Sequence, residues 1–218
     1  MYLTDLLLVF LKWPEPGRVK TRLANDIGAE KAAEIYRILV QRVIQRISPI
    51  YSELEGVCWV FDPIEKEYEI KDWIKKELND LGFTDLKRHC FWSQSAGDLG
   101  ERLRSAFEKA FSLGYDRIIG IGTDCIELDS LTIEQALVSL SSERSIVFGP
   151  SFDGGYYLIG MRSNLGLSVF KSISWSTSKV LKQSLDQAVS VDLDYTLLDE
   201  FNDVDTLEDW DSIRFLIE

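Results

Sequence analysis

Histidine and cysteine, which supply many zinc sites and nucleophilic active sites, are scarce in this chain of 218 residues. The one histidine, His89, excludes a zinc site built from several histidines, and a Ser-His-Asp triad would have to use it. His89 lies in a strand-like run, which favours a structural role. The three cysteines (Cys58, Cys90 and Cys125) are an odd number, widely spaced and set in apolar runs. This pattern indicates buried, reduced thiols in a cytoplasmic protein.

Long apolar runs and positive charge are also in short supply. The longest apolar run, residues 6–11, is far shorter than the roughly 20 residues that span a bilayer. It lacks the basic flank and the small-residue cleavage site of a secretory signal, so we interpret it as a buried strand without a membrane span. The chain has 24 Lys and Arg against 36 Asp and Glu, a net charge of −12. Such an acidic surface argues against nucleic acids and anionic membranes as partners.

Strand-like and helix-like patterns alternate along the chain, and 45% of the residues are apolar. Strands are expected at residues 6–11, 56–61, 86–92, 117–121, 145–148 and 154–161. Helices are expected at residues 32–47, 64–81, 98–113, 131–140, 177–189 and 205–216. This alternation predicts an α/β fold, with a single domain over residues 1–218 arranged as a three-layer α/β/α sandwich around a mainly parallel, Rossmann-like sheet. Ligands of such sheets bind at the carboxyl ends of the strands.

The loop after the first expected strand reverses the charge of the chain. It contains four cations and one acid, Lys12, Arg18, Lys20, Arg22 and Glu15. This excess of positive charge predicts an anion site, with phosphate as the obvious anion, and Gly17 would let the backbone approach it. The glycine patterns of a Walker A loop and of G-x-G-x-x-G are both missing. The alternative interpretation is a solvated basic turn.

Three aspartates in two other loops are candidates for a metal ligand or a helix cap. Asp124 lies just beyond the strand expected at residues 117–121, where it could hold Mg²⁺ or Mn²⁺ opposite the basic loop. Near the C-terminus, Asp205 and Glu208 have the spacing of a capping box, so we expect Asp205 to cap the helix 205–216. Asp203 has no such structural partner, and we expect it to be the second metal ligand; the sequence leaves Asp205 open as the alternative ligand.

Two further loops are candidates for substrate contacts. The turn Asp153-Gly154-Gly155 precedes Tyr156 and Tyr157. It could simply join two strands, or it could provide a small-residue floor with aromatic walls for a sugar or similar acceptor.

Residues 94–102 contain a second capping-box pattern. Asp98 and Glu101 are expected to open the helix 98–113, and this structural interpretation is strong. Gln94 and Gly97 could still lie near a nucleotide base.

Taken together, these segments resemble a known family. They include F-L-K-x-P-x-P-G-x-V-K-T-R-L, G-D-L-G-E-R, G-T-D-C, G-P-S-F-D-G-G-Y-Y-L-I-G-M, I-S-W-S-T and D-V-D-T-L-E-D. The combination resembles the bacterial glycosyltransferase-like family of the GT-A (nucleotide-diphospho-sugar transferase) superfamily, often described as arsenosugar-biosynthesis-type or radical-SAM/selenodomain-associated transferases. More distantly, it is similar to the molybdenum-cofactor and phospholactate nucleotidyltransferases. The chain departs from the family at Ile126 and Leu207, where proline is usual, and we expect this to affect loop rigidity rather than chemistry.

The resemblance, which spans about residues 6–210, implies a metal-dependent transferase with a nucleotide-activated donor, most simply a nucleoside-diphosphate sugar, and a small-molecule acceptor. On this hypothesis Lys20 and Arg22 neutralise the donor phosphates, Asp124 and Asp203 hold Mg²⁺ or Mn²⁺, and Asp153 orients or deprotonates the acceptor. The nucleotide-binding residues would be Lys12, Gly17, Lys20, Thr21, Arg22, Gln94 and Gly97. The acceptor-binding residues would be Asp153, Gly154, Gly155 and Tyr156.

Two alternatives stay open. A nucleotidyltransferase would use the same site, with the acceptor attacking the α-phosphate of a nucleoside triphosphate and releasing pyrophosphate. A catalytically silent module would bind nucleotides without turnover. The base, the sugar, the acceptor and the oligomeric state are left open by the sequence.

Overall fold

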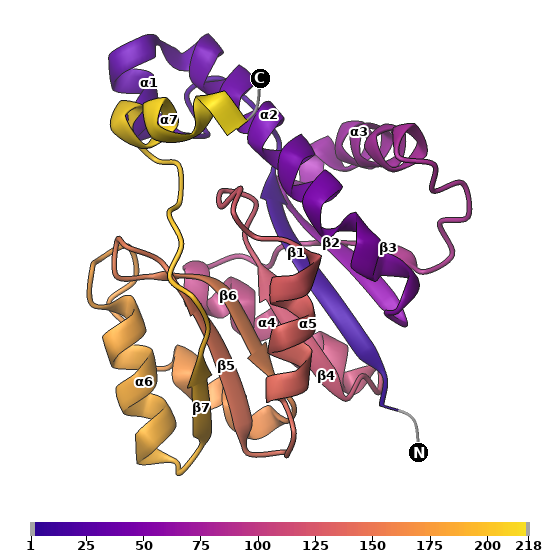
Figure 1. Cartoon of the computed structure of the whole chain (residues 1–218), viewed down its shortest axis with the longest axis vertical. Coiled ribbons are helices and arrows are strands. Elements are labelled where there is room, and N and C mark those ends of the chain that lie inside the picture. Colours follow the sequence, from indigo (N-terminus) through magenta and orange to yellow (C-terminus); the bar gives the residue numbers. More distant parts are fainter. Residues whose placement is uncertain (1–2, 217–218) are drawn as a thin grey trace.

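The computed structural model describes residues 3–216, which form a seven-stranded sheet with helices on both faces (Figure 1). The strands are Asp5–Lys12 (β1), Gly56–Asp62 (β2), His89–Ser93 (β3), Arg117–Ile121 (β4), Ser145–Pro150 (β5), Tyr156–Met161 (β6) and Asp194–Leu197 (β7). The α-helices are Thr21–Ile27 (α1), Ala29–Ile47 (α2), Glu67–Asp80 (α3), Leu99–Ser112 (α4), Ser130–Ser139 (α5), Val180–Ser190 (α6) and Leu207–Ile213 (α7). Short 3-10 helices occur at Ser48–Ser52 (η1), Ile64–Lys66 (η2), Asn164–Phe170 (η3) and Arg214–Leu216 (η4). The expected three-layer α/β/α sandwich is confirmed.

The sheet is mainly parallel, as predicted, with one strand reversed. Its order is β3-β2-β1-β4-β6-β5-β7, and β1 pairs in parallel with both β2 and β4. Strand β6 runs antiparallel to β4 and β5. The chain passes from β5 to β6 through a short turn rather than a crossover helix, and such a connection requires antiparallel strands.

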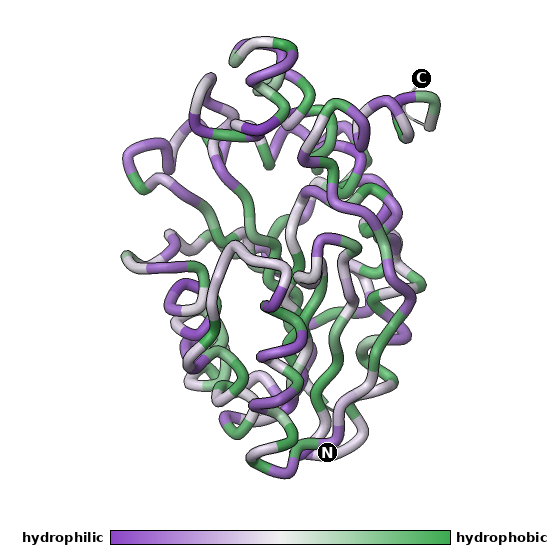
Figure 2. Tube along the Cα trace, turned by 90° about the vertical axis from the view of Figure 1, so that its left-hand side faces the viewer, coloured by the Kyte–Doolittle hydropathy of each residue, from purple (hydrophilic) through white to green (hydrophobic). Residues whose placement is uncertain are grey.

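Strand β1 shows why a continuous apolar run forms a central strand. Leu6 and Leu8 are buried in a core shared with α4 and α6, whereas Leu7 and Val9 are buried in a second core shared with α2, α3 and α5. Both faces of a parallel sheet are covered by helices, so alternation with polar residues is unnecessary. In Figure 2 the central strands are largely green, and much of the purple lies on the periphery.

A third apolar cluster lies beyond the carboxyl edge of the sheet, where α1 and α7 are side by side in Figure 1. Leu23 of α1 and Ile213 of α7 both pack in this cluster, with Val204 from the segment that connects β7 to α7. That segment crosses the carboxyl ends of the strands, and the Val204 N–H donates to the carbonyl of Asp124 at 3.1 Å. Neither α1 nor β7 was expected from the sequence.

Several expected elements differ at their ends. The strand expected at 86–92 begins at His89, whose N–H donates to the Leu86 carbonyl in a preceding turn. The strand expected from residue 154 begins at Tyr156, because Gly154 and Gly155 belong to the turn before it. The helix expected at 64–81 divides into η2 and α3. The helix 98–113 is confirmed as α4, with the predicted Asp98–Glu101 capping box.

Among residues 3–216, no helix combines the length and the apolar composition that crossing a bilayer requires.

Candidate active site

A cavity of about 770 Å³ opens at the carboxyl ends of β1 and β4. Its wall comes from the loop after β1, the turn after β4, the turn between β5 and β6, residues 175–178 and the segment before α7. Ten of the residues predicted from the sequence line it: Lys12, Lys20, Thr21, Arg22, Gln94, Asp124, Asp153, Gly155, Tyr156 and Asp203. Three predicted glycines do not line it: Gly17, Gly97 and Gly154.

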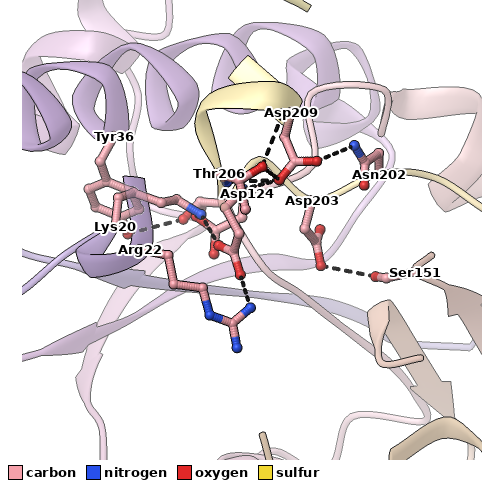
Figure 3. Close-up of polar contacts among 11 residues, drawn as sticks. Lys20, Arg22, Tyr36, Asp124, Ser151, Asn202, Asp203, Thr206 and Asp209 are labelled. Atoms are coloured by element: carbon pink, nitrogen blue, oxygen red, sulfur yellow. Dashed lines mark hydrogen bonds and ion pairs between the residues drawn. The ribbon is translucent and has the colours of Figure 1, made fainter. Parts of the chain in front are cut away.

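Lys20 is the central cation of this cavity (Figure 3). Only 4% of its side chain is exposed, and Nζ lies 2.7 Å from Asp124 Oδ1 and 3.0 Å from Asp205 Oδ1. Burial opposes the charge of the ammonium group, yet the two carboxylates hold the pKa of Lys20 above its ordinary value. Lys20 is therefore a charged, buried group that links the turn after β4 to the segment before α7.

Asp203 brings a further carboxylate into the same cavity. It accepts a hydrogen bond from Ser151 Oγ at 3.0 Å, as drawn in Figure 3. Burial and the negative charge of Asp124 raise the pKa of Asp203 to about 7. The charge of Asp124 therefore opposes ionisation of Asp203, and a cation bound by these carboxylates would relieve that opposition.

Tyr36 and Thr123 form a buried polar link that the sequence analysis missed. Tyr36 OH accepts a hydrogen bond from the Lys12 N–H at 2.9 Å and lies 3.2 Å from Thr123 Oγ1, which donates to the Phe10 carbonyl at 3.3 Å. Burial, together with the charge of Asp124, raises the pKa of Tyr36 to about 12, so the hydroxyl stays neutral. The only signal in the sequence is a hydroxyl group within the apolar stripe of an amphipathic helix.

The predicted role of Asp205 as a helix cap is wrong. Helix α7 begins at Leu207, and its cap is Thr206, which forms the capping box with Asp209. The spacing that suggested Asp205 with Glu208 recurs one residue later, and the later register is the one used. Asp205 instead forms ion pairs with Lys20 and, at 3.6 Å, with the exposed Arg22.

The Asp153-Gly154-Gly155 turn joins β5 to β6 and also contributes to the cavity wall. Asp153 Oδ1 accepts a hydrogen bond from the Gly155 N–H at 2.8 Å. Gly154 has a φ of +86°, and a Cβ there would collide with the carbonyl of Ser178, so this position requires glycine. The hydroxyl of Tyr157 is engaged elsewhere, because it donates to the Asp199 carbonyl at 2.9 Å. The turn therefore connects two strands, as one interpretation predicted, and Asp153 and Gly155 also line the cavity. Acceptor binding by this turn stays a prediction.

Gln94 lines the cavity, but its amide is already used. Its Nε2 donates to the carbonyls of Leu11 and Val60, and its Oε1 accepts from Arg102. Gln94 therefore ties together the ends of β1 and β2. Gly97 lies in the turn before α4 with a φ of +107°, and a Cβ there would collide with Glu101 of the capping box.

Gly17 likewise has a structural reason for its identity. Its φ is +79°, a conformation that side chains with a Cβ rarely adopt, and it lies in an exposed part of the loop. The loop therefore turns at Gly17 and delivers Arg18, Lys20 and Arg22 to the cavity wall.

Trp175 and the three residues after it line the cavity although no role was predicted for them. The Trp175 ring meets Tyr156 edge to face with a centroid distance of 6.5 Å. This distance lies within the range of roughly 4.5–7 Å that is usual for aromatic pairs. At Gly100, on the first turn of α4, a Cβ would collide with the Trp175 indole. A lone tryptophan within the serine-rich loop I-S-W-S-T was the available signal.

Within residues 3–216, no group of three or more His, Cys, Asp or Glu side chains could by itself hold a metal ion. Asp124 and Asp203 nevertheless fit a divalent cation that takes only two of its ligands from the protein. Mg²⁺ commonly binds through one or two carboxylates and takes its remaining ligands from water and substrate phosphates. The raised pKa of Asp203 next to Asp124 is the observation that supports this fit.

The histidine and the thiols have no part in this proposed chemistry, although Cys125 directly follows Asp124 in the chain. His89 stacks on Trp59 and accepts a hydrogen bond from its Nε1, which agrees with the expected structural role. The cysteines are free, as predicted; Cys58 and Cys125 are buried, whereas Cys90 is only partly buried.

A family model matches part of this chain, and solved structures match almost all of it. Residues 69–177, half of the chain, match the family described as uncharacterized protein conserved in bacteria (DUF2064). A candidate nucleotide-diphospho-sugar transferase from Desulfovibrio desulfuricans G20 is 33% identical, with a TM-score of 0.83 over 97% of this chain and 87% of that one. No curated protein matches the chain.

More distant solved structures share the fold alone. A nucleotidyl transferase from Methanothermobacter is 10% identical, with a TM-score of 0.61 over 98% of this chain and 97% of that one. The 4-diphosphocytidyl-2C-methyl-D-erythritol synthase of Anaerococcus prevotii DSM 20548 is also 10% identical, with a TM-score of 0.57 over 99% of both chains.

Proposed function

This chain belongs to the bacterial family DUF2064 and is a transferase with the nucleotide-diphospho-sugar transferase fold, and we propose that it is a metal-dependent glycosyltransferase. Its donor is a nucleoside-diphosphate sugar, and its acceptor is a small molecule with a free hydroxyl group. The free thiols support a cytoplasmic location for this activity.

One observation carries the proposal: cations and carboxylates from distant parts of the chain meet in one cavity at the carboxyl edge of the sheet. The cations are Lys12, Arg18, Lys20 and Arg22, and the carboxylates are Asp124, Asp153, Asp203 and Asp205. In an acidic protein, such a local concentration of cations suits a polyanion such as a diphosphate. Carboxylates beside those cations suit the hard divalent ion that accompanies a diphosphate.

Lys20 and Arg22 have distinct roles in this proposal. Buried Lys20 places a positive charge in the cavity wall, whereas Arg22, whose side chain is 66% exposed and pairs with Asp205 at 3.6 Å, would contact the donor from the solvent side. Asp124 and Asp203 would hold Mg²⁺ or Mn²⁺. When bound, that cation would neutralise charge on the leaving diphosphate.

Asp153 is the residue proposed to act on the acceptor. It is exposed and lines the cavity beside Gly155 and Tyr156. Its carboxylate accepts one backbone hydrogen bond, from Gly155, which holds it at the start of β6. A carboxylate held in this way can orient an acceptor hydroxyl and take its proton as the new bond forms.

A second candidate function is nucleotidyl transfer from a nucleoside triphosphate. The observation in its favour is the number of cations on the wall, because a triphosphate carries more negative charge than a diphosphate. The two reactions release different products, namely a nucleoside diphosphate and pyrophosphate.

The test is an assay of the purified protein with Mn²⁺ or Mg²⁺ and a small-molecule cell extract as the source of acceptor. Nucleoside-diphosphate sugars and nucleoside triphosphates are supplied separately, and release of nucleoside diphosphate and of pyrophosphate is measured against the Asp153→Asn variant. Release of nucleoside diphosphate supports the proposal, and release of pyrophosphate supports the alternative.

A thermal-shift screen distinguishes a silent module from an inactive assay. A nucleotide at 100 times its Kd adds about 2.7 kcal/mol to the free energy of unfolding. Stabilisation by nucleotides with no turnover of any donor would favour the silent module. Absence of any nucleotide effect would contradict all three hypotheses.

A further inference from the structure

We infer that Lys20 is an internal competitor of the divalent cation, so that the site accepts the cation together with a phosphate ligand and disfavours the bare ion. This inference rests on the proposed function, because it takes the phosphates of the donor as the ligand. It assigns to Lys20 a positioning role that phosphate binding alone would not require.

The first support is the place that Lys20 Nζ occupies. The ammonium group lies 2.7 Å from Asp124 Oδ1 and 3.0 Å from Asp205 Oδ1 and is almost completely buried. Asp124 is the carboxylate proposed to hold the metal. A divalent cation on Asp124 would therefore lie close to a positive charge that is shielded from water, and the repulsion between them weakens its binding.

The second support is the backbone of Lys20. Its φ of 46° and ψ of 47° lie in the left-handed region, which residues with a Cβ seldom adopt. Lys20 adopts this conformation directly before α1. Figure 3 shows its side chain extending toward Asp124. The fold thus holds a strained residue in order to place an ammonium group between two carboxylates.

The third support is the charge balance around Lys20. Asp124 and Asp205 contact the buried ammonium group, and Asp203 lines the same cavity. Arg22, at 3.6 Å from Asp205, is an exposed partner. A diphosphate adds negative charge and acceptor oxygens for the lysine. With those oxygens present, Lys20 and the cation have separate partners and both can stay.

The test measures binding of Mn²⁺ alone, by the electron paramagnetic resonance signal of the free ion. The variants are Lys20→Met, Lys20→Arg and, as the matched control, Lys76→Met. Lys76 is an exposed lysine of α3 that does not line the cavity. We expect the Lys20→Met variant to bind bare Mn²⁺ about tenfold more tightly, because a charge within 4–6 Å has been removed. The other two variants should bind it as the wild type does.

A second arm uses inorganic pyrophosphate in EDTA, followed by calorimetry. Here Lys20→Met should weaken binding about tenfold or more, so that one substitution changes the two affinities in opposite directions. Lys20→Gln is measured in parallel, since its amide can still donate to Asp124 and Asp205 if the methionine variant loses its fold.

The outcomes separate this inference from the proposed function. Unchanged or weaker Mn²⁺ binding by folded Lys20→Met and Lys20→Gln proteins, with pyrophosphate bound by the wild type, overturns the inference and leaves the proposed function standing. Tighter Mn²⁺ binding by the variants supports the competition. Failure of pyrophosphate to bind the wild type would overturn the proposed function and the phosphate half of this inference.

Discussion

Two ion-paired clusters, each with at least one buried member, lie at opposite ends of the central strands, and they are built differently. At the amino end, Arg117 of β4 donates two hydrogen bonds of 2.6 Å to Asp5 of β1, one to each carboxylate oxygen. At the carboxyl end, Lys20 faces both Asp124 and Asp205, with Asp203 nearby. The first pair matches one cation with one carboxylate, whereas the second has more negative than positive charge. A balanced pair needs no further partner, whereas an unbalanced cluster with a perturbed pKa is a candidate functional site.

The amino end contains a second, similarly self-contained feature. His89 begins β3 and packs between Tyr51, Trp59 and Phe83. Its Nδ1 accepts from Trp59 Nε1 at 3.3 Å. We therefore expect substitutions at the amino end to change stability, and substitutions at the carboxyl end to change binding and catalysis.

The largest effect is expected at Asp124. Asp124→Asn should reduce turnover on the order of 10²-fold or more, because a carboxylate proposed to hold the charge-neutralising divalent cation is lost. Its melting temperature without ligands should stay close to that of the wild type. The control is Asp85→Asn, an exposed carboxylate paired with exposed Lys87. Full turnover by the Asp124→Asn protein would break the contrast between the two ends of the sheet.

A smaller effect, on stability, is expected at Arg117. Arg117→Met should lower the free energy of unfolding by about 1.5–3 kcal/mol, because charged hydrogen bonds to partly buried Asp5 are lost. Denaturant unfolding measures this change. The matched control is Arg104→Met on α4, whose pair with Glu108 is exposed and should contribute less than about 1 kcal/mol. A lower nucleotide affinity in the folded Arg117→Met protein would contradict the assignment of this end to stability.

The neighbours Asp205 and Thr206 should separate an effect on ligand binding from an effect on stability. Thr206→Ala removes the cap of α7 and should cost about 0.5–2 kcal/mol of stability, with little effect on pyrophosphate binding. Asp205→Asn should change ligand binding through Lys20 and leave α7 capped. Unfolding curves and calorimetry on both variants measure the two effects. Equal losses of stability would show that Asp205 supports the helix after all.

The smallest effect is a pH dependence at His89. Burial lowers the pKa of His89 to about 4, whereas an unfolded histidine titrates near 6.5. Between these values the unfolded chain binds the proton, so stability falls as the pH decreases from 6.5 toward 4. His89→Gln should remove part of this slope, and its amide oxygen can still accept from Trp59. Parallel slopes of unfolding free energy against pH for the two proteins would contradict this assignment.

Much of the fold and ten of the residues that line the cavity could be predicted, because their signals in the sequence are local. The run of residues 6–11 has no polar position, and it forms the central strand β1. Asp98 and Glu101 have capping-box spacing, and they form that box. The basic loop and Asp124 follow adjacent parallel strands, whose carboxyl ends necessarily lie at the same edge of the sheet.

The errors have a common cause. Both Asp205 with Glu208 and Thr206 with Asp209 satisfy the capping pattern, and local sequence does not choose between them. Asp205 is bound by Lys20, 185 residues away in the chain, and Thr206 is left to cap α7. Strand β7 was missed for a similar reason, since its four residues are exposed and only their pairing with β5 makes them a strand.

By itself, the sequence determined the α/β layers, the buried strands and the chemical character of each loop, because periodicity and turn chemistry act over a few residues. Only the tertiary structure decided which charges meet. It placed Lys20 on Asp124 and Asp205, put Tyr36 beneath the end of β1 and left Asp203 with a raised pKa. Electrostatic interactions depend on distance and burial in the folded chain, and neither quantity is contained in the spacing of residues along it.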